Sequence, residues 1–341
     1  MTAIVPVQLS DPALEKVIAE GLAQVEAGLR EAVKIEQPLL NEAAAHLIAG
    51  GKRLRPTLVL LAGQFGSHPD ERIVPGAIAI ELTHLATLYH DDVMDEAAVR
   101  HGRPSANARW DNTVAILTGD FLFSCASNVL AGLGAEAIRV QATTFAQLVS
   151  GQIAETLGPQ PGQDPLEHYM KVVTDKTASL IATSGRFGAM FSDAPEGVAA
   201  GIAKACGAFG VAWQLADDIL DVASETVQSG KTPGTDLRQG VRTLPVLYAL
   251  RSTGQSPATL PADPSPADVR LRWLLDEADL TDEALLAEAL TLLRGHHAMK
   301  ESRADVLNWL HEARVSISAL PDGPARAAFL ALCDFVEKRT G

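Results

Sequence analysis

The sequence predicts an all-α protein with one domain, and three observations support this. Apolar residues recur at spacings of three and four along most of the chain, as on the buried face of a helix. Alternating strand-like runs with turn pairs between them are almost absent. No internal repeat of solenoid length is found, and the Pro- and Ser-rich stretch 252–268 reads as a surface loop. We therefore expect a single domain over 1–341, in which 1–10 is flexible.

The individual helices follow from capping residues and periodicity. Asp11-Pro12 predicts a helix start, with Asp11 as the cap and Pro12 in the first turn. Gly50-Gly51 ends the next helix. The apolar stripe of the first helix consists of Leu14, Val17, Ile18, Leu22, Val25, Leu29 and Val33. Further helices are expected over 56–65, 72–95, 111–131, 135–157, 164–191 and 196–222, and again from about Val269 to the end.

Composition argues against several classes of protein. The chain is 47% hydrophobic and 21% charged, which is ordinary for a folded protein with a large core. Its net charge of -14 argues against a nucleic-acid-binding surface, which needs clustered Lys and Arg. An acidic protein that handles anions has to bring cations to them, either as metal ions or as a few placed basic side chains.

The sequence also predicts a cytoplasmic location without a transmembrane segment. The segment 1–11 lacks a basic start and a signal-like apolar block. No uninterrupted apolar run reaches about 18 residues, the length that a spanning helix needs. Cys125, Cys206 and Cys333 are far apart and form no CxxC motif, so we expect free buried thiols rather than disulfides or a zinc site.

Two aspartate clusters of the form DDxxD stand at the ends of apolar helices. The first is Asp91-Asp92-Val93-Met94-Asp95, and the second is Asp217-Asp218-Ile219-Leu220-Asp221. Residues four apart lie about one turn along the same helix face, so the outer aspartates of each cluster point together. A divalent cation relieves the repulsion among these carboxylates, and all-oxygen ligation suits Mg²⁺ shared with substrate phosphates. The alternative is a solvated acidic helix end, which two such clusters make less attractive than one.

Three basic segments accompany the clusters. Gly50-Gly51-Lys52-Arg53-Leu54-Arg55-Pro56 joins two helices, and its glycines allow close approach of the backbone to a ligand. Arg100-His101-Gly102-Arg103-Pro104 follows the first cluster, and Gly230-Lys231-Thr232-Pro233-Gly234 follows the second. Basic side chains next to metal-binding carboxylates are suited to a metal-bridged phosphate. Taken alone, each basic segment can equally complement the dipole of a neighbouring helix end.

These motifs, in this order, resemble the trans-isoprenyl diphosphate synthase (polyprenyl synthetase) family, and the long-chain members in particular. The matching stretches are GGKRLRP at 50–56, ELTHLATLYHDDVMDEAAVRHGRPS at 81–105, TGDFLF at 118–123, DKTASL at 175–180, WQLADDILDV at 213–222 and GKTPGTDLRQGVRTLP at 230–245. The resemblance implies a helical bundle around a central cavity, usually a homodimer. It implies a transferase that ionises an allylic diphosphate and condenses it with isopentenyl diphosphate, using several Mg²⁺ ions or Mn²⁺ as a substitute.

The resemblance also assigns roles to individual residues. Asp91, Asp95 and Asp217 correspond to Mg²⁺ ligands, supported by Asp92, Asp218 and Asp221. Arg100, Lys176 and Lys231 correspond to contacts with the allylic diphosphate, and Lys52, Arg55 and His84 to contacts with isopentenyl diphosphate. Thr177 and Gln214 correspond to groups whose oxygens face the developing allylic cation. Without the resemblance, Lys176 reads as a surface lysine and Gln214 as an amide on a helix face.

The chain departs from the family pattern at two places. His101 stands where a second arginine is usual, and it is neutral for much of the time near pH 7. We therefore expect weaker or pH-dependent binding of isopentenyl diphosphate. Val241 stands where many members have a lysine, and whether the neighbouring Arg242 substitutes for it is open at this point.

The length of the product is expected to depend on the helix that precedes Asp91. The residues four, five, eight and eleven positions before the cluster are Thr87, Ala86, Thr83 and Ile80. Ile80 is the first bulky candidate for a floor, and a floor about three turns down favours products of about C20 to C30. Ala79 and Gly76 leave further space beyond it. We expect about C30 to C50 from the long-chain resemblance, with a C20 geranylgeranyl product as the alternative.

Three rival classes are less compatible with the motifs. A class I terpene cyclase also carries DDxxD, but usually has an Asn/Ser/Glu motif in place of the second cluster and lacks the GGKxxRP loop. A di-iron helical bundle needs two ExxH pairs, whereas the chain has only Glu81-Leu82-Thr83-His84. A silent partner subunit of another synthase tends to lose the aspartate clusters, and this chain keeps both.

Overall fold

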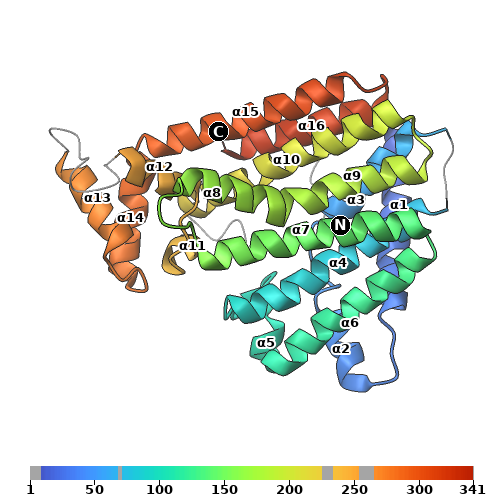
Figure 1. The fold of residues 1–341 in the computed structure, drawn as a ribbon, viewed down its shortest axis with the longest axis horizontal. Helices are drawn as coiled ribbons and strands as arrows, with labels where there is room; N and C mark the ends of the chain where they lie inside the picture. Colours follow the sequence, from blue (N-terminus) through green and yellow to red (C-terminus); the bar gives the residue numbers. More distant parts are fainter. Residues whose placement is uncertain (1–8, 68–70, 225–232, 253–264, 341) are drawn as a thin grey trace.

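A computed structural model describes residues 9–67, 71–224, 233–252 and 265–340 (Figure 1). The described chain is almost entirely helical, which confirms the predicted all-α class. Its one sheet among these residues is a pair of two-residue antiparallel strands, β1 (Val99–Arg100) and β2 (Arg103–Pro104). Of the predicted flexible start, 1–8 lies outside the described residues, and Leu9 is packed into the core.

The helices follow one another along the whole chain with short connections. They are α1 (Pro12–Ala32), α2 (Pro38–His46), α3 (Leu54–Ala62), η1 (Gly63–Phe65), α4 (Ile73–Met94), α5 (Ala106–Arg109), α6 (Asn112–Ala131), α7 (Ala135–Leu157), α8 (Pro165–Val172), the π-helical turn η2 (Val173–Ala178), α9 (Ser179–Phe191), α10 (Glu196–Ala223), α11 (Thr235–Arg238), α12 (Leu244–Ser252), α13 (Pro266–Asp276), α14 (Glu283–Gly295), α15 (Ala298–Ser318) and α16 (Pro324–Thr340).

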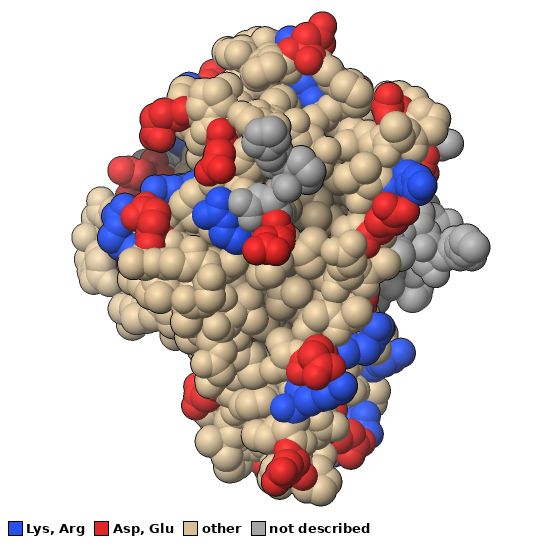
Figure 2. Space-filling model, turned by 90° about the vertical axis from the view of Figure 1, so that its right-hand side faces the viewer, with Lys and Arg blue, Asp and Glu red and all other residues tan. Residues whose placement is uncertain are grey.

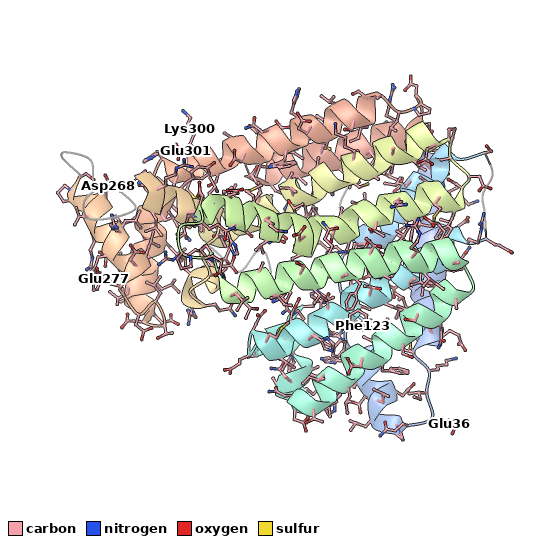
Figure 3. All side chains as sticks on the ribbon, viewed as in Figure 1. Glu36, Phe123, Asp268, Glu277, Lys300 and Glu301 are labelled. Carbon is pink, nitrogen blue, oxygen red and sulfur yellow. The ribbon has the colours of Figure 1, made fainter. Side chains whose placement is uncertain are left out.

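The long helices lie side by side and share one hydrophobic core (Figure 1). Helix α4 packs against α6, α3 and α9, and α10 packs against α9 and α15. Because α4 is enclosed in this way, its first two turns are entirely apolar, and its polar residues begin at Glu81. The hairpin of α13 and α14 lies at one end of the molecule, where Figure 3 labels Asp268 of α13 and Glu277, the residue after it.

The turn η2 lies between α7 and α10, and two glycines allow this close packing. A Cβ atom on Gly151 of α7 would collide with the backbone of η2 at Asp175 and Lys176. A Cβ atom on Gly210 of α10 would collide with Ala178 at the other side of η2. Larger residues at either glycine would push η2 away from its neighbours. The two glycines therefore allow η2, which carries Lys176 and Thr177, to lie close against both α7 and α10.

Local signals in the sequence placed most helix ends correctly. The Asp11 carboxylate accepts a hydrogen bond of 2.7 Å from the Leu14 N–H, and Pro12 begins α1. The prediction was wrong for Val17, which is 46% exposed because it lies beside the buried stripe of α1 rather than on it. The predicted loop 252–268 is also too long. Its part 253–264 lies outside the described residues, but α13 begins at Pro266 because Ser265 caps the Asp268 N–H.

Two of the described helices, α6 and α10, are long and apolar enough to cross a membrane by length and composition alone. Half of the apolar stretch of α10 is buried inside the protein, and α10 contacts α9 and α15, as a core helix does. Helix α6 is less covered, since 39% of its stretch is buried. At the end of the molecule drawn in Figure 2, Lys and Arg side chains are interspersed with Asp and Glu. The three cysteines are buried and free, as predicted.

Candidate active site

The first aspartate cluster ends α4 and splits into two environments. Asp91 is half-buried and Asp95 is exposed, and both lie near the positive charge of Lys176. Burial raises the pKa of Asp91 to about 6, and the neighbouring Asp95 adds to the shift, whereas Lys176 opposes it. Neither carboxylate forms a direct ion pair with another described residue, although Asp92 does. Two partly desolvated carboxylates on one face are thus available to a cation.

Asp92 turns into the protein and has a different role. Its side chain is fully buried, and its Oδ1 accepts a hydrogen bond of 2.6 Å from Nε of Arg100. Burial raises the pKa of Asp92, and the charge and hydrogen bond of Arg100 oppose this shift. Since the same carboxylate cannot also lie beside Asp91 and Asp95, its contacts support the placement of Arg100 rather than direct ligation of a metal.

A short hairpin brings two of the basic segments together. His101 and Gly102 both have positive φ angles, 51° and 74°, as the central residues of a two-residue hairpin turn do. The His101 ring lies against Gly50, where a Cβ atom would come within 3.2 Å of its Nδ1. Side chains at Gly50 would therefore displace His101. The sequence predicted both segments, and the structure shows that they converge on one side of the site.

Arg55 and His84 lie in the same basic region, and both are affected by burial. Burial lowers the pKa of Arg55, and among the described residues its Nε has no hydrogen-bond partner. Burial also lowers the pKa of His84 well below its usual value, and the charges of Arg55, His101 and Arg100 act in the same direction. Lys52 is exposed at the rim. Such a concentration of nitrogen donors is suited to an anion with several oxygens.

Arg53, which had no assigned role, anchors the basic loop. It is 4% exposed and has a left-handed φ of 48° at the start of α3. Its guanidinium forms ion pairs with Glu26 and with Glu81, the latter at 2.9 Å, and donates to the Ile48 carbonyl. Because Glu81 pairs with Arg53, it is not arranged beside His84 as a metal ligand. This arrangement also disfavours the di-iron alternative.

The π-helical turn η2 connects the two aspartate clusters. Burial alone lowers the pKa of Lys176, but the charges of Glu155 and Asp91 outweigh it and raise the pKa. The next residue, Thr177, lies beside Gln214 of α10, with its Oγ1 donating to Gln214 Oε1 at 3.1 Å. Gln214 Nε2 then donates to Asp218 Oδ1 at 2.8 Å. Gln214 therefore connects Thr177 of η2 to Asp218 of the second aspartate cluster, although Thr177 is 37 positions before Gln214 in the sequence.

The second aspartate cluster is bound to protein groups at every aspartate. Asp217 Oδ1 accepts from Arg339 Nη2 at 2.6 Å, and Asp218 accepts from the Tyr169 hydroxyl as well as from Gln214. Burial raises the pKa of Asp218 to about 8, and the charge of nearby Asp236 adds to the shift. Asp221 accepts from the backbone N–H groups of Thr235 and Asp236 at 3.2 and 3.1 Å, which fixes α11.

Comparison with known proteins identifies the family. The sequence profile described as polyprenyl synthetase matches residues 37–262. The chain belongs to the polyprenyl synthetase family. It is 45% identical over 342 residues to a nonaprenyl diphosphate synthase of Mycobacterium tuberculosis, covering 100% of this chain and 98% of that protein. The reading of the motifs as those of a prenyltransferase is thereby confirmed.

Solved structures agree with this assignment. A geranylgeranyl pyrophosphate synthase from Corynebacterium glutamicum, complexed with calcium and isoprenyl diphosphate, superposes with a TM-score of 0.85 at 40% identity, covering 98% of this chain and 100% of that chain. A decaprenyl diphosphate synthase from Rhodobacter capsulatus superposes with a TM-score of 0.84 at 31% identity, covering 96% and 99%. These relatives differ in the product that their names give, so the family alone leaves the chain length of this polyprenyl synthetase open.

The residues at the first cluster fit a divalent metal ion, although the described residues contain no group of three or more His, Cys, Asp or Glu side chains already gathered for one. Asp91 and Asp95 supply carboxylate oxygens, and within the described part of the chain the buried Oε1 of Gln152 on α7 has no hydrogen-bond partner. Hard oxygen donors of this kind suit Mg²⁺, which keeps several of its own waters or substrate oxygens. A polyprenyl synthetase site assembled by substrate phosphates needs no closed protein cage.

Four residues near the site were missed by sequence reasoning. Gln152 and Glu155 lie on α7, and the Glu155 carboxylate pairs with Lys176. Their signal was a polar Gly-Gln-x-x-Glu ending on a partly apolar helix, which was not weighed. Tyr169 and Arg339 had no local signal at all, because each acts only through a contact with the second cluster. Lys231, a predicted contact to the allylic diphosphate, lies outside the described residues.

The structure also describes the surroundings of Arg242 and of Gly76 in this polyprenyl synthetase. Arg242, the neighbour of Val241, pairs through its Nη2 with Asp276 of α13 at 3.0 Å in the described structure. The space expected beyond Ile80 is not open at Gly76. The ring of Phe191 occupies the position of a side chain there, 2.5 Å from where a Cβ atom would lie. Close packing of α4 against α9 explains this, since α4 is buried on that side as well.

The other residues predicted to line the product route belong to α4. Ile80, Thr83 and Ala86 are almost fully buried, and Thr87 is half-buried near the Asp91 end. Helix α4 thus presents small or polar residues in the two turns below Asp91 and a bulky aliphatic residue one turn deeper. Below the cluster, Phe123 of α6 stands between His90 of α4 and Phe145 of α7, with ring centroids 5.8 and 4.4 Å apart (Figure 3).

Proposed function

We propose that this prenyltransferase condenses isopentenyl diphosphate onto an allylic diphosphate with Mg²⁺ and releases an all-trans polyprenyl diphosphate of about C30 to C50. The observation that carries the proposal is the set of contacts through η2. Lys176 lies by Asp91 and Asp95, and Thr177 contacts Gln214, which in turn contacts Asp218. Acidic groups suited to metal ions and a base suited to phosphate thus surround one point between α4 and α10.

Binding of the allylic diphosphate follows from the charges around η2. Asp91 and Asp95 would hold Mg²⁺, while Lys176 and Arg100 would contact the phosphate oxygens. Bound Mg²⁺ would neutralise the charge that develops on the departing diphosphate. The Lys176 ammonium acts on the same charge, and its position is fixed in advance by Glu155 and by the packing of η2. Preorganised charges cost no rearrangement when the C–O bond breaks.

Isopentenyl diphosphate would occupy the basic region built by Lys52, Arg55, His84 and His101. The partnerless Nε of Arg55 supports this placement, because a buried guanidinium without a ligand is costly. The oxygens of Thr177 and Gln214 face the developing allylic cation in this proposal. The apolar interior keeps water from the cation, and the departed diphosphate takes the proton that is lost when the double bond re-forms.

The alternative product is geranylgeranyl diphosphate, C20, and one observation favours it. Phe191 fills the space beside Gly76, so the route along α4 is closed about four turns below Asp91. A class I terpene cyclase remains the more distant alternative. The basic loop 50–56 opposes it, because Arg53 and Arg55 are both built into the interior next to the site.

We also propose a cytoplasmic homodimer formed through α6 and α7. Several large apolar residues of these two helices are exposed, although an isolated protein would bury them. They are Ile116, Leu117, Ile138, Val149, Ile153 and Leu157. A second copy of the same chain is an occupant that buries such a face on both partners. Light scattering coupled to gel filtration tests this, and Leu117→Arg is expected to give monomers.

The test of the proposed function is product analysis with the purified protein. Labelled isopentenyl diphosphate is supplied with Mg²⁺ and with C5, C10, C15 or C20 allylic diphosphates as primers. We expect all-trans products of about C30 to C50 by mass spectrometry after dephosphorylation. A terminal product of C20 supports the alternative, and cyclic hydrocarbons without use of isopentenyl diphosphate support a cyclase. Absence of any prenyl product from all four primers contradicts the proposal.

A separate hypothesis concerns His101. If its ring binds isopentenyl diphosphate, the Michaelis constant for that substrate should rise as the imidazole loses its proton between about pH 5.5 and 8. His101→Arg should flatten this profile, since the guanidinium stays charged. A flat profile in the wild-type protein removes the hypothesis without affecting the rest of the proposed function.

A further inference from the structure

A buried amide connects α7 to α4 in the interior below the site. Gln141 of α7 is 7% exposed and donates from its Nε2 to Oγ1 of Thr83 at 2.6 Å, and Thr83 is 1% exposed. The Thr83 hydroxyl itself donates to the Ala79 carbonyl at 2.9 Å, so it can only accept from the amide. The other end of the amide, Gln141 Oε1, is buried without a partner among the described residues.

This hydrogen bond lies on the face of α4 that leads away from the first cluster. Ile80, Thr83, Thr87 and Asp91 recur at spacings of three and four and therefore share one side of the helix. Asp91 faces Lys176 and Glu155, and Glu155 belongs to α7. Thr83 precedes Asp91 by two turns, which places the Gln141 contact about 12 Å below the cluster. The amide thus joins α7 to the side of α4 along which the proposed route of the growing tail runs.

We propose that Gln141 determines the chain length of the product, because its hydrogen bond to Thr83 bars the route that the tail follows along α4. The inference rests on the proposed function and on that route. An isoprene unit is about as long as one helical turn, so the tail reaches the bar after about two to three units, and each later unit of a C30 to C50 product is added only while the amide is displaced. To grow further, the apolar tail has to push the amide aside and break its one hydrogen bond in a place that offers no water in exchange.

The unmet Oε1 of Gln141 distinguishes this contact from ordinary helix packing. A buried amide oxygen without a partner is unfavourable by about 1–3 kcal/mol, so a purely structural role would be better served by an apolar residue. One turn along α7, Thr144 Oγ1 lies 2.7 Å from Thr183 Oγ1 of α9. Thr144 lines an outer groove of 370 Å³ between α7, α9 and α10, away from α4. It therefore provides a matched control for loss of a buried polar contact.

The experiment compares product lengths of Gln141→Ala, Gln141→Phe, Thr83→Val and the control Thr144→Val with those of the wild type. Each purified variant is incubated with excess isopentenyl diphosphate, Mg²⁺ and a C15 primer. Gln141→Ala removes the bar and Thr83→Val removes its anchor, so both should lengthen the main product by at least one isoprene unit. Gln141→Phe fills the route and should shorten it. Thr144→Val should leave the distribution unchanged.

Two further measurements separate this role from a structural one. The rate of the first condensation with a C5 primer should stay within about threefold of wild type in Gln141→Ala and in the control Thr144→Val, since the site at Asp91 is two turns away. Melting temperatures show whether each variant is folded. Should Gln141→Ala fail to fold, Thr83→Val and Gln141→Phe still decide the question.

The inference is overturned if the folded Gln141 and Thr83 variants give the wild-type distribution, or if Thr144→Val shifts it to the same extent. A wild-type protein that makes no prenyl product at all contradicts the proposed function instead. Wild-type products with unaltered lengths in every variant contradict only the assignment of Gln141. The two failures are thus distinguishable within one set of reactions.

Discussion

The two DDxxD clusters have the same sequence pattern but differ in how the protein surrounds them. At the end of α4, Asp91 and Asp95 form no direct ion pair with a described residue and lie opposite Lys176. At the end of α10, Asp217 is paired with Arg339. The neighbouring Asp218 is enclosed by Tyr169 and Gln214, and Asp221 accepts from the start of α11. The first cluster is prepared for a cation, whereas the second already has protein partners.

This difference implies that the two clusters contribute unequally to metal binding. A ligand of the first cluster gains carboxylates that are partly desolvated and unpaired. A ligand of the second has to displace an arginine and leave two hydrogen-bonded aspartates in place. We therefore expect the first cluster to bind metal ions more tightly in the absence of substrate, and the second to join when the diphosphate brings further charge.

The largest effect is expected for Asp91→Ala. Loss of this carboxylate removes a predicted metal ligand, and kcat/KM should fall by about 10³-fold or more. Calorimetric titration of the substrate-free protein with Mn²⁺ should show the loss of its tightest site. The comparison between the clusters fails if Asp217→Ala removes that site and Asp91→Ala leaves it intact.

A smaller but still large effect is expected for Lys176→Gln, because this lysine lies between the clusters. The substitution removes the charge and leaves a polar side chain that is one atom shorter, so kcat should fall by about 10²-fold. The carboxylate of Glu155 then loses its ion-pair partner at the same time. Lys171→Gln serves as the control, since Lys171 lies one turn earlier, pairs with Asp175 and is exposed. An equal loss of activity in both variants would contradict a specific role for Lys176.

The next effect concerns pH and the second cluster. The folded-state pKa of Asp218 is raised by burial to about 8, above its usual value of 3.8. The folded protein therefore holds a proton that the unfolded chain releases, and this contribution to stability is lost as pH rises towards 8. Relative to wild type, Asp218→Asn should gain up to about 2 kcal/mol of unfolding free energy between pH 6 and 8.

Chemical denaturation at several pH values measures that gain. His84 acts in the opposite direction, because its lowered pKa makes the folded protein lose stability as pH falls below the ordinary value of histidine. Because His84 is present in both the wild type and Asp218→Asn, its contribution cancels when their unfolding free energies are subtracted. A constant difference across the range would show that Asp218 is ionised in the folded protein at pH 6.

The smallest effect is expected for Arg339→Met, which frees Asp217. The guanidinium also lies over the Trp213 ring, 4.8 Å from its centroid, and methionine keeps part of that contact. Stability of the metal-free protein should fall by about 1 kcal/mol. Affinity for Mn²⁺ at the second cluster should rise a few-fold, because the ion no longer competes with a fixed cation. An unchanged affinity for Mn²⁺ would show that displacing Arg339 from Asp217 costs little free energy.

Much of the site was predictable because its residues lie in short motifs. Capping at Asp11, the apolar periodicity of α1 and the spacing of Asp91 and Asp95 depend on neighbours within one or two turns. Lys176 and Gln214 were identified only through the resemblance to the family, since each reads as an ordinary helix residue by itself. Arg53 was beside two predicted residues in the loop 50–56, but nothing local showed that it turns inward to Glu81.

The sequence by itself determined the helices, the order of the motifs and hence the family. Only the tertiary structure decided which groups neutralise each aspartate, that Phe191 fills the space at Gly76, and that Gln141 meets Thr83. The physical reason is the separation along the chain between the residues that interact. Helix formation and capping are set by residues a few positions apart, whereas Asp217 and Arg339 are 122 positions apart and meet only because α10 and α16 pack together.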